Sequence, residues 1–74
     1  MPRSPQLIQI HKFIGLRLEI IRMKRKETLK DVYMTIGIAP KTLSMIEKGQ
    51  TNYREATLEK LCKYYEVEFE DLLP

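Results

Sequence analysis

The sequence has little of what disulfides, membrane spans and secretion require. Among its 74 residues there is one cysteine, Cys62, so no internal disulfide can form, which is typical of the reducing cytoplasm. No apolar run approaches the roughly 20 residues that a transmembrane helix needs. Residues 7–18 are interrupted by charged side chains and no small-residue cleavage site follows, so we expect no signal peptide. The sequence predicts a cytoplasmic protein without membrane contact.

Residues that support catalysis or hold a cofactor are equally sparse. The only histidine, His11, lies at the edge of a predicted core face, where we expect a structural role. No cysteine and histidine cluster has zinc spacing, and the acidic residues of 66–71 lack the spacing of a calcium loop. The three glycines are scattered rather than gathered in a phosphate-binding loop. The sequence therefore predicts a protein that is not an enzyme and that has no metal and no cofactor.

The composition is that of one folded domain spanning residues 1–74. The chain is 43% hydrophobic and 31% charged, which argues against disorder. Its net charge of +3 is compatible with nucleic-acid binding but too small to imply it alone. A chain this short buries only about 60% of its unfolded surface, so a partner subunit would add stability.

A long helix is predicted from Pro5 to about Lys26, with Ser4 and Pro5 as its start signal and Gly15 as its one interruption. At about 100° per residue, it carries two apolar stripes on roughly opposite sides. The first is the predicted core face, formed by Leu7, Ile10, Ile14, Leu18 and Ile21. The second, called the second stripe below, is formed by Phe13, Leu16, Ile20 and Met23.

The second stripe has two explanations at this stage. The C-terminal residues could fold over it, or leave part of it exposed. Alternatively, it could be a surface for self-association, because contiguous exposed apolar patches tend to be interfaces; the sequence slightly favours this homodimer. The helix ends in the basic run 22–26, which suits both the negative end of a helix dipole and contact with phosphate.

Residues 28–49 are predicted to form two short helices joined by a tight turn. Thr28 is suited to cap the first, and Gly37 to end it in the left-handed conformation. Pro40 opens the second helix where no N–H is needed, and Gly49 ends it. Two helices of this length with glycine in a short connection indicate a helix-turn-helix unit, whose second helix would face a DNA major groove.

The remaining chain predicts a polar loop over 50–54, a helix over about 55–65 and a last short helix before Pro74. The resulting fold is all-α and compact, with five helices and a long first one. Three segments, IGLRLEIIR, TLKDVYMTIGIAPKTLSMIEKG and TLEKLCKYYEVEFEDLL, resemble the Cro/C1-type (Xre-family) helix-turn-helix domain of phage repressors. The resemblance covers residues 14–73 and implies a lambda-repressor-like domain that binds operator DNA, usually as a homodimer.

The resemblance also implies roles for individual residues. Arg22 and Glu47 match positions that form a buried ion pair between the first helix and the recognition helix. The recognition helix, about 40–48, would contribute Lys41, Thr42, Ser44, Met45 and Lys48. The loop after it would contact the DNA backbone through Gln50, Thr51, Asn52 and Tyr53. The basic end of the first helix would add Arg22, Lys24 and Arg25.

Several residues depart from the family pattern. Leu29 replaces a glutamine that often contacts phosphate, and Tyr33 replaces a small inward residue. Met34 and Met45 place apolar groups where polar ones are usual. The sequence therefore leaves two functions open. One is a sequence-specific transcriptional regulator, a repressor acting as a homodimer; the other is an antitoxin or another module that uses the fold to bind a protein partner.

Overall fold

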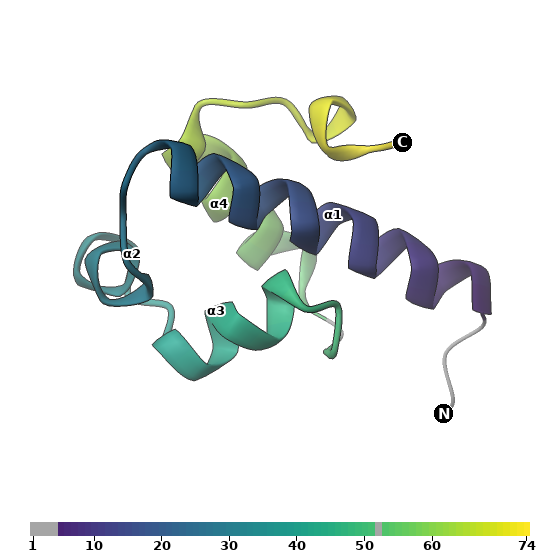
Figure 1. The fold of residues 1–74 in the computed structure, drawn as a ribbon, viewed down its shortest axis with the longest axis horizontal. Coiled ribbons are helices and arrows are strands. Elements are labelled where there is room, and N and C mark those ends of the chain that lie inside the picture. The colour runs from purple at the N-terminus through teal and green to yellow at the C-terminus, as the bar shows by residue number, and fades with distance from the viewer. Residues whose placement is uncertain (1–4, 52) are drawn as a thin grey trace.

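The computed structural model describes residues 5–51 and 53–74, with side chains described from residue 9 onward. In these ranges all regular structure is helical: α1 Pro5–Lys24, α2 Leu29–Ile36, α3 Pro40–Glu47 and α4 Glu55–Tyr65, followed by one 3-10 turn, Phe69–Leu72. In Figure 1, α1 crosses over the pair formed by α2 and α3, α4 lies behind it, and the last residues return along α1. The predicted all-α fold is confirmed, with the fifth helix reduced to a 3-10 turn.

The helix-turn-helix unit begins and ends at the residues that the sequence predicts. Thr28 Oγ1 accepts a hydrogen bond from Asp31 N at 3.1 Å, and Asp31 Oδ2 accepts one from Thr28 N at 2.8 Å. This reciprocal capping box satisfies two otherwise unpaired donors. Gly37, at φ 75°, ends α2 in the left-handed region. Pro40 then opens α3 without help from Ala39, whose side chain cannot cap.

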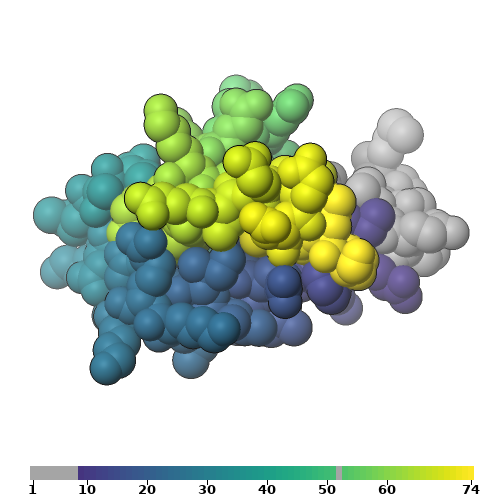
Figure 2. Space-filling model, turned by 90° about the horizontal axis from the view of Figure 1, so that it is seen from above, coloured from purple at the N-terminus to yellow at the C-terminus, as the bar shows by residue number. Residues whose placement is uncertain are grey.

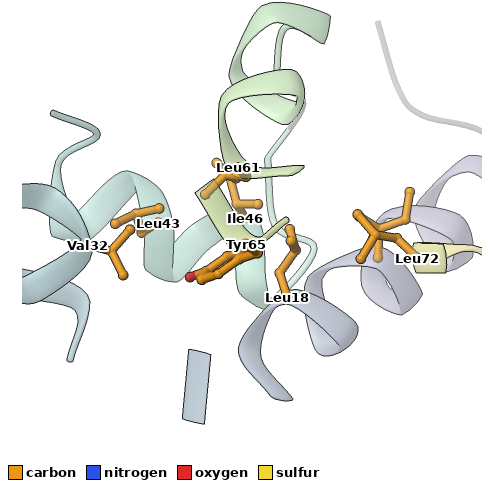
Figure 3. Packing of buried hydrophobic residues seen from close by; sticks show 8 residues of the cluster. Leu18, Val32, Leu43, Ile46, Leu61, Tyr65 and Leu72 are labelled. Atoms are coloured by element: carbon orange, nitrogen blue, oxygen red, sulfur yellow. The ribbon is translucent and has the colours of Figure 1, made fainter. Parts of the chain in front are cut away.

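The core contains a contribution from every helix of the described chain. In Figure 3, Leu18 of α1, Ile46 of α3 and the α4 residues Leu61 and Tyr65 meet at the centre. Val32 of α2 lies beside Leu43 of α3, which holds the two helices of the helix-turn-helix together (Figure 3). Among the residues whose side chains are described, the buried apolar ones are Ile14, Leu18, Val32, Leu43, Ile46, Leu61, Tyr65 and Leu72. Burial, helped by the Glu47 carboxylate, raises the pKa of Tyr65 to about 12.

Two predictions for α1 were wrong. Ile10, expected in the core, is 40% exposed, because the first turns of α1 extend beyond the helices that it crosses (Figure 1). Leu7 lies outside the described side chains. The helix also stops at Lys24, about two residues early, because the chain must turn before Thr28, and Lys26 adopts a left-handed φ of 57° there.

The second stripe remains largely on the surface. Leu16 is 51%, Ile20 38% and Met23 63% exposed, while Phe13 is half-buried. The C-terminal residues lie against α1, as Figure 2 shows with yellow beside dark blue. They are joined to it by a hydrogen bond of 3.2 Å from Arg17 Nη2 to the backbone oxygen of Asp71. This segment runs along α1 but leaves the second stripe open to contact.

α1 lies close to the end of α3 at Gly15. Gly15 of α1 is buried, and a Cβ atom there would lie 2.3 Å from the backbone oxygen of Ile46 and 2.5 Å from that of Glu47. Only a residue without a side chain allows the two helices to come this close. The interruption that Gly15 makes in the apolar pattern of α1 is therefore the crossing point that positions α3.

Within the described residues, no helix combines the length and the hydrophobicity that crossing a bilayer would require.

Candidate nucleic-acid interface

The outward face of α3 gathers the side chains expected to contact DNA. Leu43, Ile46 and Glu47 are buried, so the helix has one side fixed in the core. On the other side Lys41, Thr42 and Lys48 are exposed, and Ser44 and Met45 are half-buried. This face offers two ammonium groups, two hydroxyls and a thioether on a single short helix. Such a set could donate to base edges or phosphates and contact a thymine methyl group.

A buried ion pair fixes the orientation of α3. Arg22 Nε donates to Glu47 Oε2 at 2.7 Å and Arg22 Nη2 to Glu47 Oε1 at 3.0 Å, a two-pronged contact between the ends of α1 and α3. Arg22 Nη1 also donates to the backbone oxygen of Glu27 at 2.8 Å. The two side chains are only 14% and 6% exposed. The hydrogen bonds to Glu47 raise the pKa of Arg22.

This geometry corrects one of two roles predicted for Arg22. Its donors point at Glu47 and Glu27, and its side chain is nearly covered, so it is not placed to reach a phosphate as well. We therefore assign Arg22 to positioning α3 and remove it from the set of DNA contacts. The sequence periodicity could not distinguish an ion pair with Glu47 from a contact with phosphate, because either role is compatible with the position of Arg22 near the end of α1.

Arg25 remains on the surface, held by neighbours. Its Nε lies 2.5 Å from Glu27 Oε1, and its guanidinium stands 4.9 Å from the ring centre of Tyr64. The Tyr64 hydroxyl donates to the same Glu27 carboxylate, which lowers the pKa of that carboxyl. The Arg25 side chain is still 40% exposed, and Lys24 beside it is exposed. Arg25 is thus pre-positioned with part of its donor set facing water.

In the loop after α3, some side chains face solvent and one packs against α1. Gln50 is exposed and Thr51 half-buried, whereas Asn52 lies outside the described residues. The ring of Tyr53 packs edge-on against His11, with the ring centres 5.0 Å apart, and the Tyr53 hydroxyl oxygen is buried. The predicted contact of this residue with DNA stays a prediction. Burial also raises the pKa of Tyr53. The packing of Tyr53 against the domain could have been predicted from the sequence, because it is an aromatic residue in an otherwise polar loop.

The departures in α2 leave apolar groups around the helix-turn-helix. Leu29 packs against the core, so the first residue of α2 offers no polar side chain to a phosphate. Tyr33 is 42% exposed and Met34 is 72% exposed. The buried contact between α2 and α3 is made instead by Val32 and Leu43.

Charge is divided along the chain. Residues 1–54 contain eleven basic residues (lysine or arginine) and four acidic residues. Residues 55–74 contain two basic and six acidic residues. The part that contains α1 to α3 therefore has a net charge of +7 and the rest −4. Lys26 and Lys30 are exposed on either side of the α2 N-terminus. Lys26 belongs to the basic run 22–26 that the sequence predicts to suit phosphate contact, whereas Lys30 was not among the candidate contacts.

No group of three or more histidine, cysteine, aspartate or glutamate side chains in the described part of the chain is arranged to hold a metal ion. The family model of the Cro/C1-type helix-turn-helix DNA-binding domain matches residues 17–74, which include all of α2, α3 and α4. No curated protein matches the sequence. With the matched span and the helix-turn-helix geometry in agreement, the chain belongs to the Cro/C1-type helix-turn-helix DNA-binding family.

Proposed function

We propose that this protein is a transcriptional regulator that represses by occupying an operator, which it reads through α3 as a homodimer. The observation that supports this most directly is the outward face of α3, with Lys41, Thr42 and Lys48 exposed on a helix whose opposite side is fixed in the core. Family membership supplies the DNA-binding character of the domain.

The side chains divide into two kinds of contact. Thr42 and Ser44 are proposed to hydrogen-bond base edges, Met45 to contact a thymine methyl group, and Lys41 to reach a guanine edge or a phosphate. The proposed backbone contacts supply affinity without sequence preference. They are Lys24, Arg25, Lys48, Gln50, Thr51 and Asn52, together with the exposed Lys26 and Lys30.

The homodimer is proposed to form through the second stripe of α1. Leu16, Ile20 and Met23 are exposed apolar residues on one side of a long helix, and a two-fold pairing would bring this patch of one copy against the same patch of the other. A pairing that sets the two α3 helices about 34 Å apart would match half-sites one turn of DNA apart.

The DNA contact is tested by fluorescence anisotropy on a labelled duplex over a salt series. Affinity is expected to fall steeply with salt, and Lys41→Ala to reduce the slope of log K against log salt by about 1. Lys63→Ala on α4 removes the same charge away from α3 and should leave the slope unchanged. On a duplex selected from a random library, Thr42→Ala should weaken binding by about fivefold or more. No binding at about 50 mM salt would contradict the proposal, because counterion release favours the complex most there.

The dimer is tested by multi-angle light scattering at micromolar concentration. The wild type is expected to run as a dimer, and Leu16→Glu and Ile20→Glu as monomers, because a charge in an apolar interface loses its hydration. Met34→Glu places the same charge on an apolar residue of α2 that is 72% exposed, and it should remain dimeric. A monomeric wild type would rule out this interface and favour the protein-partner function.

A further inference from the structure

A cleft away from α3 has the form of a small-molecule site. It lies between α4 and the segment after it, has a volume of about 660 Å³, and takes its described lining from residues that follow α3. Its volume is within the range of about 300 to 1,000 Å³ that ligand pockets occupy. Its lining includes the half-buried Leu58, Cys62 and Val67, called the apolar floor below, and two aromatic residues, Tyr53 and Phe69.

The rim of this cleft is acidic. The exposed Glu55 and Glu59 lie four residues apart on one face of α4, and the exposed Glu68 of the following segment also lines the cleft. Among the described lining residues, Lys63 is the one basic residue. The field reaches the floor, where burial and the carboxylates of Glu68 and Glu59 raise the pKa of the Cys62 thiol. In a protein of net charge +3, this is a local reversal of sign.

We propose that this cleft binds an apolar organic cation, an amine or quaternary ammonium attached to an aromatic or aliphatic body. The body would be buried on the floor of Leu58, Cys62 and Val67. The cationic group would remain at the rim beside Glu55 and Glu59, where the faces of Tyr53 and Phe69 also attract it. The inference is independent of DNA binding, because no residue of α3 takes part.

The test is a titration of ¹⁵N-labelled protein followed by NMR, with three probes that share one body: 4-phenylbutylamine, 4-phenyl-1-butanol and 4-phenylbutyrate. The amine is expected to shift the amides of residues 58–69 with half-saturation below about 5 mM, which is ordinary for a ligand of its size. The alcohol should bind at least about fivefold more weakly, because it lacks the charge pairs, and the carboxylate should bind most weakly.

A double variant separates charge from shape. Glu55→Gln with Glu59→Gln keeps the size of both side chains and should reduce the affinity for the amine to that for the alcohol. Glu19→Gln with Glu66→Gln removes the same charge from residues outside the lining and should leave it unchanged. The proposal is overturned if the amine binds no better than the alcohol, if the shifts fall outside the cleft, or if both double variants behave alike.

Discussion

Replacing Gly15 with alanine is expected to lower the free energy of unfolding by about 2–3 kcal/mol, a large part of the stability of a small domain. The added Cβ would lie 2.3 Å from the backbone oxygen of Ile46 and 2.5 Å from that of Glu47. These atoms belong to the end of α3 and cannot rotate away as a side chain could. One helix must therefore move from the other, which loosens the core around Leu18 and Ile46. Urea denaturation followed by circular dichroism measures the loss.

Gly37→Ala is the matched control, because it adds the same methyl group at an open position. Nothing lies within 4 Å of the new Cβ there, but the φ of 75° costs an alanine about 1 kcal/mol. If Gly15→Ala costs no more than Gly37→Ala, the close approach of α1 and α3 is not what Gly15 provides. If Gly15→Ala lowers both the stability and the affinity for DNA, the close approach at Gly15 also contributes to the placement of α3.

Both ends of α2 and the start of α3 could be predicted because each depends on chemistry within a few residues. Thr28 caps α2 through Asp31, three residues on, and Gly37 takes a positive φ that other residues adopt at a cost. Pro40 opens α3 for an equally local reason. Such signals do not depend on the rest of the chain, so they survive without knowledge of the tertiary structure.

Packing between distant segments could not be predicted in the same way. Periodicity places Ile10 on the core side of α1, but it does not say where the helices beneath α1 end, and Ile10 is exposed. Gly15 looked like an interruption of the helix, and only the crossing of α1 and α3 explains it. The side of a helix on which a residue lies follows from the sequence. How far along the helix other elements pack against that side depends on the whole fold.

The candidate site divides along the same line. The outward positions of Lys41, Thr42 and Lys48 follow from the spacing of the buried residues of α3. Whether a donor is free depends on partners far along the chain: Arg22 is held by Glu47, 25 residues away. The inward direction of the Tyr53 hydroxyl similarly depends on its tertiary surroundings.

Breaking the pair of Arg22 and Glu47 is expected to have the largest effect on stability. Glu47→Ala leaves the Arg22 guanidinium, which is 14% exposed, without its counter-charge, and should lower the free energy of unfolding by about 3–5 kcal/mol. Arg22→Ala should have a similar effect, because it strands a carboxylate that is 6% exposed. Thermal and urea denaturation measure the loss in the free energy of unfolding for each variant. We expect the less stable of the two to be partly unfolded at 37 °C.

Arg25→Ala is the control for the loss of an arginine near the same helix end. Arg25 also pairs with a glutamate, but the two side chains are 40% and 18% exposed, against 14% and 6% for Arg22 and Glu47. Glu27 would thus be nearer to water after the loss of its partner, and it would keep the hydrogen bond from the Tyr64 hydroxyl. The removal of Arg25 should destabilise the protein much less than that of Arg22. Equal losses for the two arginines would mean that general charge at the end of α1, rather than the buried pair, is what matters.

The double variant Arg22→Met with Glu47→Leu distinguishes a pair that stabilises the fold from one that mainly orients α3. Both charges are then absent, so neither is stranded, and the variant should be far more stable than the sum of the two single losses implies. The anchor of α3 to α1 would still be lost, since Arg22 supplies two hydrogen bonds to Glu47 and one to Glu27. We therefore expect a folded protein with weakened DNA binding. Full affinity in this variant would show that core packing alone orients α3.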